Sequence, residues 1–273
     1  ETSKNYIQQT NPNNDLSYAS SLHTSFDIYG YNLNKIDDKL RLNITNYQSN
    51  QNNEDNETLP TILPYIKYYS GEKNISNFKY SNNIEFYNIM RNNTTDIHAK
   101  RQRKISSLIN LNRKTIMYSS KIKFETDLYN QFFNTEDKKI NNKYVVSNYF
   151  RTFPIFAISA ETPFKIKNLK NNLIYTPKLK LVITPGMSNS DKLSNEDSSI
   201  SSYTIENNSN LNRYSGTDKL DNSKRLDLSF NIQNDLLNST FWTGYEFTNN
   251  SNYHYTQGNE KKLSDFLGDI NLT

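Results

Sequence analysis

The sequence predicts an all-β chain, an antiparallel up-and-down transmembrane β-barrel or a partial barrel of about 11–12 strands. Three observations support this fold class. Apolar and polar residues alternate with a period of two along most of the chain, whereas the 3.6-residue period of helices is hard to find. Several alternating segments exceed ten residues, about the length that a tilted strand needs to cross a bilayer. The connections are alternately short and long, as in barrels with short periplasmic turns and long outer loops.

Each expected strand has one apolar and one polar face. In segment 223–234, the even-numbered residues from Leu226 through Leu228 and Phe230 to Ile232 are apolar, and the odd-numbered residues Asp227, Ser229 and Asn231 are polar. We therefore expect the first set to face lipid and the second to face the lumen. Strands are expected near 18–31, 37–48, 58–70, 74–90, 98–110, 115–129, 146–160, 172–184, 223–234, 239–249 and 260–272, and residues 1–10 are a candidate for one more.

The connections carry the second part of the prediction. Short connections are expected near 32–36, 71–73, 111–114 and 235–238, with a medium one at 161–171. Long connections are expected near 49–57, 91–97, 130–145, 185–222 and 250–259. The longest, 185–222, exceeds what a structureless link in a compact domain needs, so we expect it to be functional or folded onto the barrel.

Composition limits the alternatives. Only 34% of the 273 residues are hydrophobic, but 20 Tyr and 14 Phe argue against disorder. A barrel with a wet lumen explains the low hydrophobic content, because half of every strand is polar. A soluble antiparallel sandwich, the main alternative, would have shorter strands and a larger apolar core. The net charge of +4 does not require nucleic acid as a partner, and the lack of Cys excludes disulfides and thiol chemistry.

The ends of the sequence suggest a piece of a longer protein. The first residue is Glu1, no signal peptide precedes it, and no stretch approaches the roughly 18 apolar residues of a membrane helix. We therefore expect an internal fragment, whose compartment cannot be deduced from a missing leader.

No motif for catalysis, cofactor binding or metal binding is found. The sequence has no nucleophile elbow, glycine-rich phosphate loop or metalloprotease motif. The acidic stretch with Asp191, Glu196 and Asp197 lacks the spacing of a calcium loop. The three histidines lack ligand-like spacing; they are His23, His98 and His254. We expect no enzymatic activity and no cofactor.

A basic cluster occupies residues 100–104. On a strand, Arg101 and Arg103 share one face, and Lys100 and Lys104 share the other. A basic row on the lumen face or at the rim could contact phosphates of an anionic glycolipid, so Arg101 and Arg103 are candidate contacts for such phosphates. The alternative is a solvated lumen face without a specific ligand.

Two blocks of the sequence form recognisable motifs. The first runs from a strand end through acidic residues to an Asn-Arg-Tyr-x-Gly-x-Asp motif, with Pro185, Asn195, Glu196, Asp197, Ser198, Asn212, Arg213, Tyr214, Gly216 and Asp218. The second is a motif at the start of a strand, with Leu59, Pro60, Leu63, Pro64 and Tyr68. Together, the two blocks resemble the LPS-assembly LptD family, especially its alphaproteobacterial branch. Two positions depart from the family pattern, because Lys219 replaces Arg and Ser194 replaces Pro.

The resemblance implies that residues 1–273 are part of a single outer-membrane β-barrel domain. The family's N-terminal periplasmic jelly-roll domain and the last barrel strands would be absent from this stretch. The implied function is assembly of lipopolysaccharide into the outer leaflet of a Gram-negative outer membrane. The implied partners are lipopolysaccharide, with Arg101 and Arg103 as candidate contacts for its phosphates, an LptE-like lipoprotein plug, outer-membrane lipids and, through the missing domain, an LptA-like periplasmic bridge.

Two other classes stay open on the sequence alone. One is a different outer-membrane barrel, such as a porin or a TonB-dependent receptor, and the other is a surface β-rich adhesin. Within the first block, we expect Gly216 to supply a positive-φ turn position and Arg213 to pair with Asp218 across that turn, both in structural roles.

Overall fold

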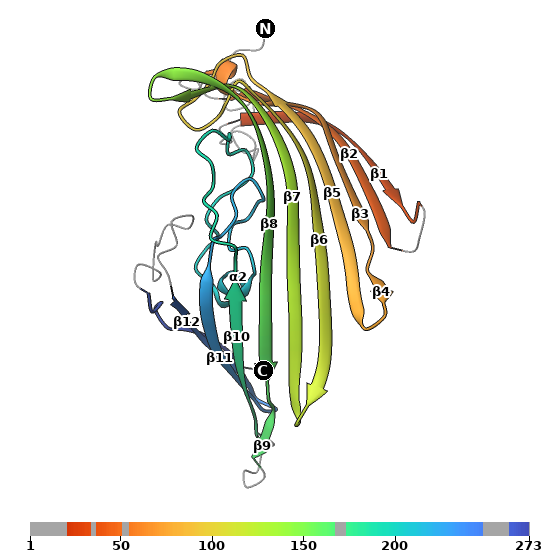
Figure 1. Ribbon diagram of the computed structural model, residues 1–273, viewed down its shortest axis with the longest axis vertical. Helices are drawn as coiled ribbons and strands as arrows, with labels where there is room; N and C mark the ends of the chain where they lie inside the picture. Colours follow the sequence, from red (N-terminus) through yellow and green to blue (C-terminus); the bar gives the residue numbers. More distant parts are fainter. Residues whose placement is uncertain (1–20, 34–36, 51–54, 167–172, 248–261, 273) are drawn as a thin grey trace, which may run out of the picture.

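The computed structural model describes residues 21–33, 37–50, 55–166, 173–247 and 262–272. These residues form one antiparallel sheet of 13 strands (Figure 1). Helical structure in the described chain is limited to η2 (Asn56–Thr58) and α2 (Ile205–Ser209), so none of these helices is long and apolar enough to cross a membrane. The all-β prediction is confirmed.

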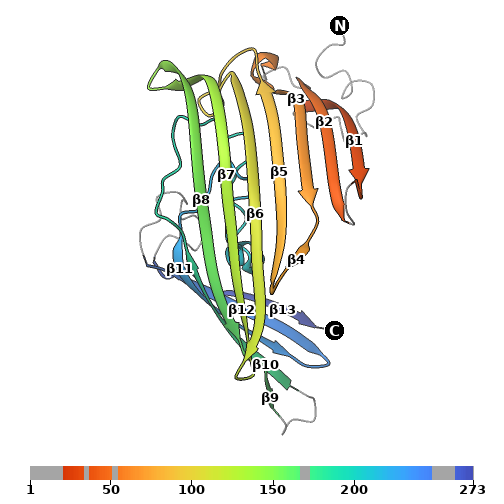
Figure 2. The ribbon, with the colours of Figure 1, turned by 45° about the vertical axis from the view of Figure 1, so that its right-hand side comes forward.

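Eleven strands form the sheet in sequence order, each hydrogen-bonded to the next. They are β1 (Ser21–Tyr31), β2 (Asp38–Ser49), β3 (Thr61–Ser70), β5 (Phe78–Met90), β6 (Arg101–Met117), β7 (Ser120–Ile140), β8 (Lys143–Glu161), β10 (Leu173–Ile183), β11 (Lys224–Gln233), β12 (Leu237–Glu246) and β13 (Leu267–Leu272). The short strands β4 (Lys73–Ile75) and β9 (Phe164–Ile166) pair with β5 and β10. This is the predicted up-and-down order, in a sheet that curves but does not close (Figure 2).

The eleven strands match the eleven expected segments, but one long connection was wrongly predicted. Residues 130–145 are not a loop: β7 and β8 continue through them and meet in a two-residue turn at Asn141 and Asn142. Both turn residues have positive φ, 49° and 60°, as a tight hairpin requires. From Asn134 to Lys139 the chain is polar on both faces, so the alternation of apolar and polar residues disappears there. The strands nevertheless stay paired up to Ile140 and Lys143, with a register shift between Thr135 and Lys138.

The turn between β6 and β7 also lies elsewhere than expected. It is formed by Tyr118 and Ser119, with φ of 50° and 64°, and not by residues 111–114. Residues 1–10 and the expected connection 250–259 lie outside the described residues, as does His254.

The two faces of the sheet have different surroundings. Side chains on the convex face, here called the outer face, include the exposed Phe132, Phe150 and Leu228. The concave, inner face is covered over β6–β11 by residues 184–223, here called the inner segment (Figure 1). A small apolar core joins them, made of Tyr129, Phe153, Ile155, Ala157, Val182, Leu211 and Leu220. The longest connection is therefore folded onto the sheet, as one of the two predicted alternatives stated.

Candidate functional site

The inner segment is held to the sheet by buried ion pairs, and Lys104 of β6 is at the centre of the first cluster. Its side chain is fully buried, and its Nζ lies 2.8 Å from Asp218 Oδ1 and 3.0 Å from Asp197 Oδ2. Nζ also donates a hydrogen bond to Thr217 Oγ1 at 2.6 Å, and the Tyr87 hydroxyl donates to Asp218 at 2.9 Å. We call these five residues the Lys104 cluster. A buried ammonium needs such partners because desolvation is costly for an isolated charge.

Asp197 and Asp218 also fold the inner segment onto itself. Asp218 Oδ2 accepts hydrogen bonds from the backbone N–H groups of Glu196 and Asp197, at 2.8 and 3.2 Å. Asp197 Oδ1 accepts from the backbone N–H groups of Thr217 and Asp218, at 3.0 and 2.8 Å. The two acidic residues therefore join two stretches of chain that are about 20 residues apart, each carboxylate capping the other's backbone.

The two carboxylates differ electrostatically. Burial raises the pKa of Asp218, and its neighbour Asp197 adds to that effect. Burial also opposes ionisation of Asp197, but Lys104 and the Ser198 hydroxyl outweigh it and hold the pKa of Asp197 below its ordinary value. The Lys104 ammonium thus stabilises both aspartates, of which Asp197 is the more firmly ionised, and it also lies 3.2 Å from Glu85 Oε1 of β5.

The expectation for Gly216 was wrong. The described glycines with positive φ are Gly71 and Gly186, so Gly216 does not supply a left-handed turn position. A Cβ at Gly216 would instead collide with the backbone carbonyl of Asp197. Glycine is required there because two backbones approach each other closely.

Glu196 attaches the inner segment to the chain just after β5. Its carboxylate forms a bidentate pair with Arg91, whose Nη1 and Nη2 lie 3.1 and 2.5 Å from the two oxygens. Ser194, which replaces the family's Pro, exchanges two backbone hydrogen bonds with the buried Gln102 side chain, both 2.8 Å long. Proline has no N–H to donate to Gln102, so Ser194 makes a contact that the usual residue cannot make.

Arg213 forms a second buried cluster, and the expectation that it pairs with Asp218 was wrong. Its Nε lies 2.5 Å from Asp221 Oδ2, and its Nη2 lies 2.5 Å from Glu246 Oε1 on β12. Burial opposes its charge, but these two carboxylates raise the pKa of Arg213 above its usual value. Asp218 is engaged by Lys104, so a different acid, eight residues after Arg213, takes its place.

The remaining residues of the first block shape the inner segment. Asn212 Oδ1 accepts from the Asp221 N–H at 3.0 Å, and its Nδ2 donates to the Gly216 carbonyl at 3.0 Å. Asn195 exchanges hydrogen bonds with the Ser198 backbone, and Tyr214 is buried and bridges Ile200. Pro185 is exposed just after β10. The structure thus brings nearly all residues of this block together within the inner segment.

The second block lies along β3 and forms no cluster with the first. Leu59 and Pro60 precede the strand, and the pairing register shifts between Ile62 and Tyr65, where Leu63 and Pro64 lie. Proline suits such a register shift because it has no backbone N–H to donate to the hydrogen bonds between strands. Farther along β3, the Tyr68 hydroxyl donates to Asp38 at 2.8 Å. These contacts belong to the sheet itself.

The structure divides the basic cluster between the two faces. Arg101 and Arg103, the basic pair, lie on the outer face at the start of β6. This is the end of the sheet with the long connections from β5 to β6 and from β10 to β11, here called the long-loop end. Each arginine has a guanidinium nitrogen 3.1 Å from Glu136. The lumen-face alternative for this pair is therefore wrong. Both arginines have odd residue numbers, like the apolar Ile105, Ile109 and Leu111 of the same strand, so the sequence already indicated that they share a face with these residues.

The residues whose roles sequence reasoning missed come from the inner wall, and of these Lys104 was named only as a member of the basic cluster. Lys104, Arg151 and Glu246 each contact the inner segment, and Arg151 donates to the carbonyls of Thr217 and Asp218 at 2.7 and 2.8 Å. Inward parity is the signal that could have identified them as candidates. Their partners lie far away in sequence, so the pairing itself could not be deduced.

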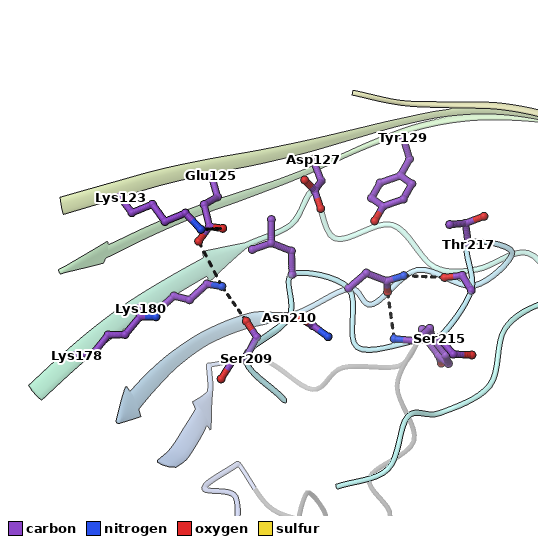
Figure 3. A pocket seen from close by; sticks show the side chains of 14 residues that line it. Lys123, Glu125, Asp127, Tyr129, Lys178, Lys180, Ser209, Asn210, Ser215 and Thr217 are labelled. Carbon is purple, nitrogen blue, oxygen red and sulfur yellow. Dashed lines mark hydrogen bonds and ion pairs between the residues drawn. The ribbon is translucent and has the colours of Figure 1, made fainter. Parts of the chain in front are cut away.

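A polar cavity of about 520 Å³ lies between residues 209–217 of the inner segment and strands β7 and β10 (Figure 3). Charged side chains from β7 and β10 project toward residues 209–217 of the inner segment; they are Lys123, Glu125, Asp127, Lys178 and Lys180. Lys180 lies 3.6 Å from Glu125 and donates to the Ser209 carbonyl at 2.8 Å. The cavity is suited to water and polar solutes. Among the described residues, no group of acidic residues and histidines could hold a metal ion.

Comparison with known families decides the identity of this architecture. The family model for LPS transport system D, LptD, matches residues 2–272. The chain belongs to the LptD family. No curated protein matches the chain. Membership assigns the chain a role in lipopolysaccharide transport and assembly, and LptD is not a known enzyme family.

Proposed function

We propose that this LptD-family chain forms barrel wall of a translocon that inserts lipopolysaccharide into the outer leaflet of the outer membrane. The observation that carries the proposal is the curved, two-faced sheet together with the family match. An apolar outer face suits lipid, and a polar inner face suits a phosphorylated sugar. No covalent chemistry is needed in such a wall.

The outer face supports a position in a bilayer. On β7, the exposed Phe124 and Phe132 face outward eight residues apart, which is about 26 Å along a strand and roughly 20 Å across a membrane at the usual tilt. Phe124 is in register with Arg113 and Ile158, and Phe132 with Ile105 and Phe150. This spacing fits the apolar band of roughly 25 Å that outer-membrane barrels present between aromatic girdles.

The proposal extends to the domain and its partners. Residues 1–273 would be part of one barrel domain, because the described sheet leaves β1 and β13 as open edges that need further strands. An LptE-like lipoprotein would occupy the lumen beside the inner segment, and an LptA-like bridge would deliver lipopolysaccharide through an N-terminal periplasmic domain. Nothing in the described structure favours a porin, a TonB-dependent receptor or an adhesin over this assignment.

The test is depletion of the protein in its source organism. We expect surface lipopolysaccharide to fall while it accumulates on the periplasmic side, measured by surface labelling and membrane fractionation. Normal surface lipopolysaccharide after depletion would contradict the proposal. Extraction of the protein by carbonate would indicate a peripheral adhesin instead of an integral wall.

A further inference from the structure

On the outer face of β5–β8, an apolar row of residues is followed by a polar row toward the long-loop end. On its other side, the apolar row is followed by a mixed row of Ile84, Ser107, Asn130 and Thr152. Four residues in register across the four strands form an apolar row: Phe86, Ile105, Phe132 and Phe150. Two residues farther toward the long-loop end, the next row contains Asn88, Arg103, Asn134 and Asn148. If the wall lies in the membrane as proposed above, this boundary is where the lipid headgroups of the outer leaflet lie.

The basic pair lies on the polar side of this boundary. Arg103 Nη1 is 3.0 Å from Asn134 Oδ1 and 3.1 Å from Glu136 Oε1, while Arg101 Nη1 is 3.1 Å from Glu136 Oε2. Two guanidinium groups thus share one carboxylate, which leaves one positive charge uncompensated within the trio. The side chains of Arg101 and Arg103 are 38% and 43% exposed, so both can reach a further anion.

Unused donors are also present. A guanidinium has five N–H donors, and the hydrogen bonds of Arg101 and Arg103 to Glu136 and Asn134 use Nη1 of each. Arg101 Nε is buried and does not face the ligand. Guanidinium groups bind phosphate oxygens bidentately, so a pair of them suits a phosphate better than the single carboxylate beside them.

A groove connects the basic pair to the apolar row. It has a volume of about 280 Å³ and is lined by Phe86, Arg103, Ile105, Phe132, Asn134 and Asn148. Its apolar part is formed by Phe86, Ile105 and Phe132, and Arg103 lies among its polar residues. A ligand with a hydrocarbon part and an anionic head would match both parts.

We infer that the basic pair and this groove bind a phosphorylated glycolipid of the outer leaflet from the membrane side. The phosphate lies on Arg101 and Arg103, and an acyl chain lies along Phe86, Ile105 and Phe132. The ligand is held after it has left the lumen, because both arginines are on the outer face. The inference rests on the membrane position proposed above and adds a specific lipid site to it.

Native mass spectrometry of the full-length protein in detergent tests the inference with three lipids: bisphosphorylated lipid A, monophosphorylated lipid A and phosphatidylglycerol. We expect Arg101→Gln/Arg103→Gln to weaken retention of bisphosphorylated lipid A by about tenfold or more, because charge-assisted hydrogen bonds are lost. Monophosphorylated lipid A should lose less. Glu136→Gln should increase retention, since it frees both guanidinium groups.

The matched control is Arg113→Gln. Arg113 lies on the same strand and the same face at the other end of the apolar band, 5.6 Å from the Phe78 ring centre. Heat-modifiable gel mobility confirms that each variant is folded. Equal retention by the wild type and the double variant would overturn the inference, as would equal losses in the double variant and Arg113→Gln.

The phosphatidylglycerol measurement distinguishes the lipid source. An equal loss for phosphatidylglycerol and lipid A would overturn the glycolipid assignment, since it would show a general contact with lipid phosphate. Neither result depends on the depletion experiment: surface lipopolysaccharide can require this protein whether or not the outer-face site binds lipid.

Discussion

Arg103 and Lys104 are neighbours in sequence, but they lie in opposite environments. Lys104 points inward, is fully buried and contacts two aspartates of the inner segment. Arg103 points outward, is 43% exposed and shares Glu136 with Arg101. The same kind of charge is therefore a structural requirement on the inner face and an available binding group on the outer face.

The difference shows how burial determines the consequence of losing a partner. On the inner face, each charge that is removed leaves an opposite charge buried and unpaired, which costs much more than the pair contributes. On the outer face, water and lipid headgroups replace the lost partner. Four predictions test this contrast, from the largest expected effect to the smallest.

Replacing Lys104 should have the largest effect. Lys104→Met leaves Asp197 and Asp218 without their ammonium, and we expect a loss of about 3–5 kcal/mol of folding free energy. Urea unfolding in lipid vesicles measures the loss, and limited proteolysis should show cleavage within residues 184–223. The control is Lys139→Met, because Lys139 is exposed and its nearest carboxylate, Asp96, is 3.5 Å away. Equal stability of the two variants would contradict the role of the Lys104 cluster.

A charge introduced on the outer face of β11 should have the second-largest effect on stability. Leu228→Arg should cost about 2–4 kcal/mol if Leu228 lies near the membrane midplane. Ser229→Arg should cost little, because Ser229 is on the inner face. The measurement is the free energy of unfolding in vesicles for both variants. Similar values would show that the assigned faces are wrong.

Gly216→Ala should have a smaller but clear effect. The added Cβ meets the Asp197 carbonyl, and the two stretches of chain must separate, at a cost of about 1–3 kcal/mol. Gly30→Ala is the control, because a Cβ there meets only the flexible Leu33 side chain, at 3.3 Å. Thermal unfolding of both variants decides the matter; an unchanged midpoint for Gly216→Ala would show that the contact is not required.

Removing the outer-face carboxylate should have the smallest effect on stability. Glu136→Ala breaks two partly exposed ion pairs, which typically contribute about 0–1 kcal/mol. The same unfolding measurement applies, with and without added salt. A loss comparable to that of Lys104→Met would mean that the two faces do not differ in the way described here.

For lipopolysaccharide transport, the two faces suggest a division of work. The inner segment narrows the lumen and is fixed by buried ion pairs, so the polar cavity beside β7 and β10 has a defined wall. In the proposed membrane position, the groove on the outer face would lie at the level of the lipid headgroups. The wall would then face a sugar on one side and a lipid on the other.

Much of the fold could be predicted from the sequence. The period-two alternation identified all eleven main strands and their order, since adjacent strands in a meander pair with each other. It also placed Leu228 and Asp227 on opposite faces, and they are 46% and 3% exposed. The error at residues 130–145 arose because both faces are polar from Asn134 to Lys139 and the period disappears there, although the two strands stay paired up to Ile140 and Lys143.

The sequence by itself determined the class of the protein, its strands and the two sets of residues that share a face, because side-chain parity is a local property of a strand. Only the tertiary structure decided which distant charges meet. Lys104 contacts Asp218 across 114 positions, and Arg213 contacts Glu246 across 33. Such pairs depend on the path of the inner segment across the concave face, and that path is set by packing and charge satisfaction together.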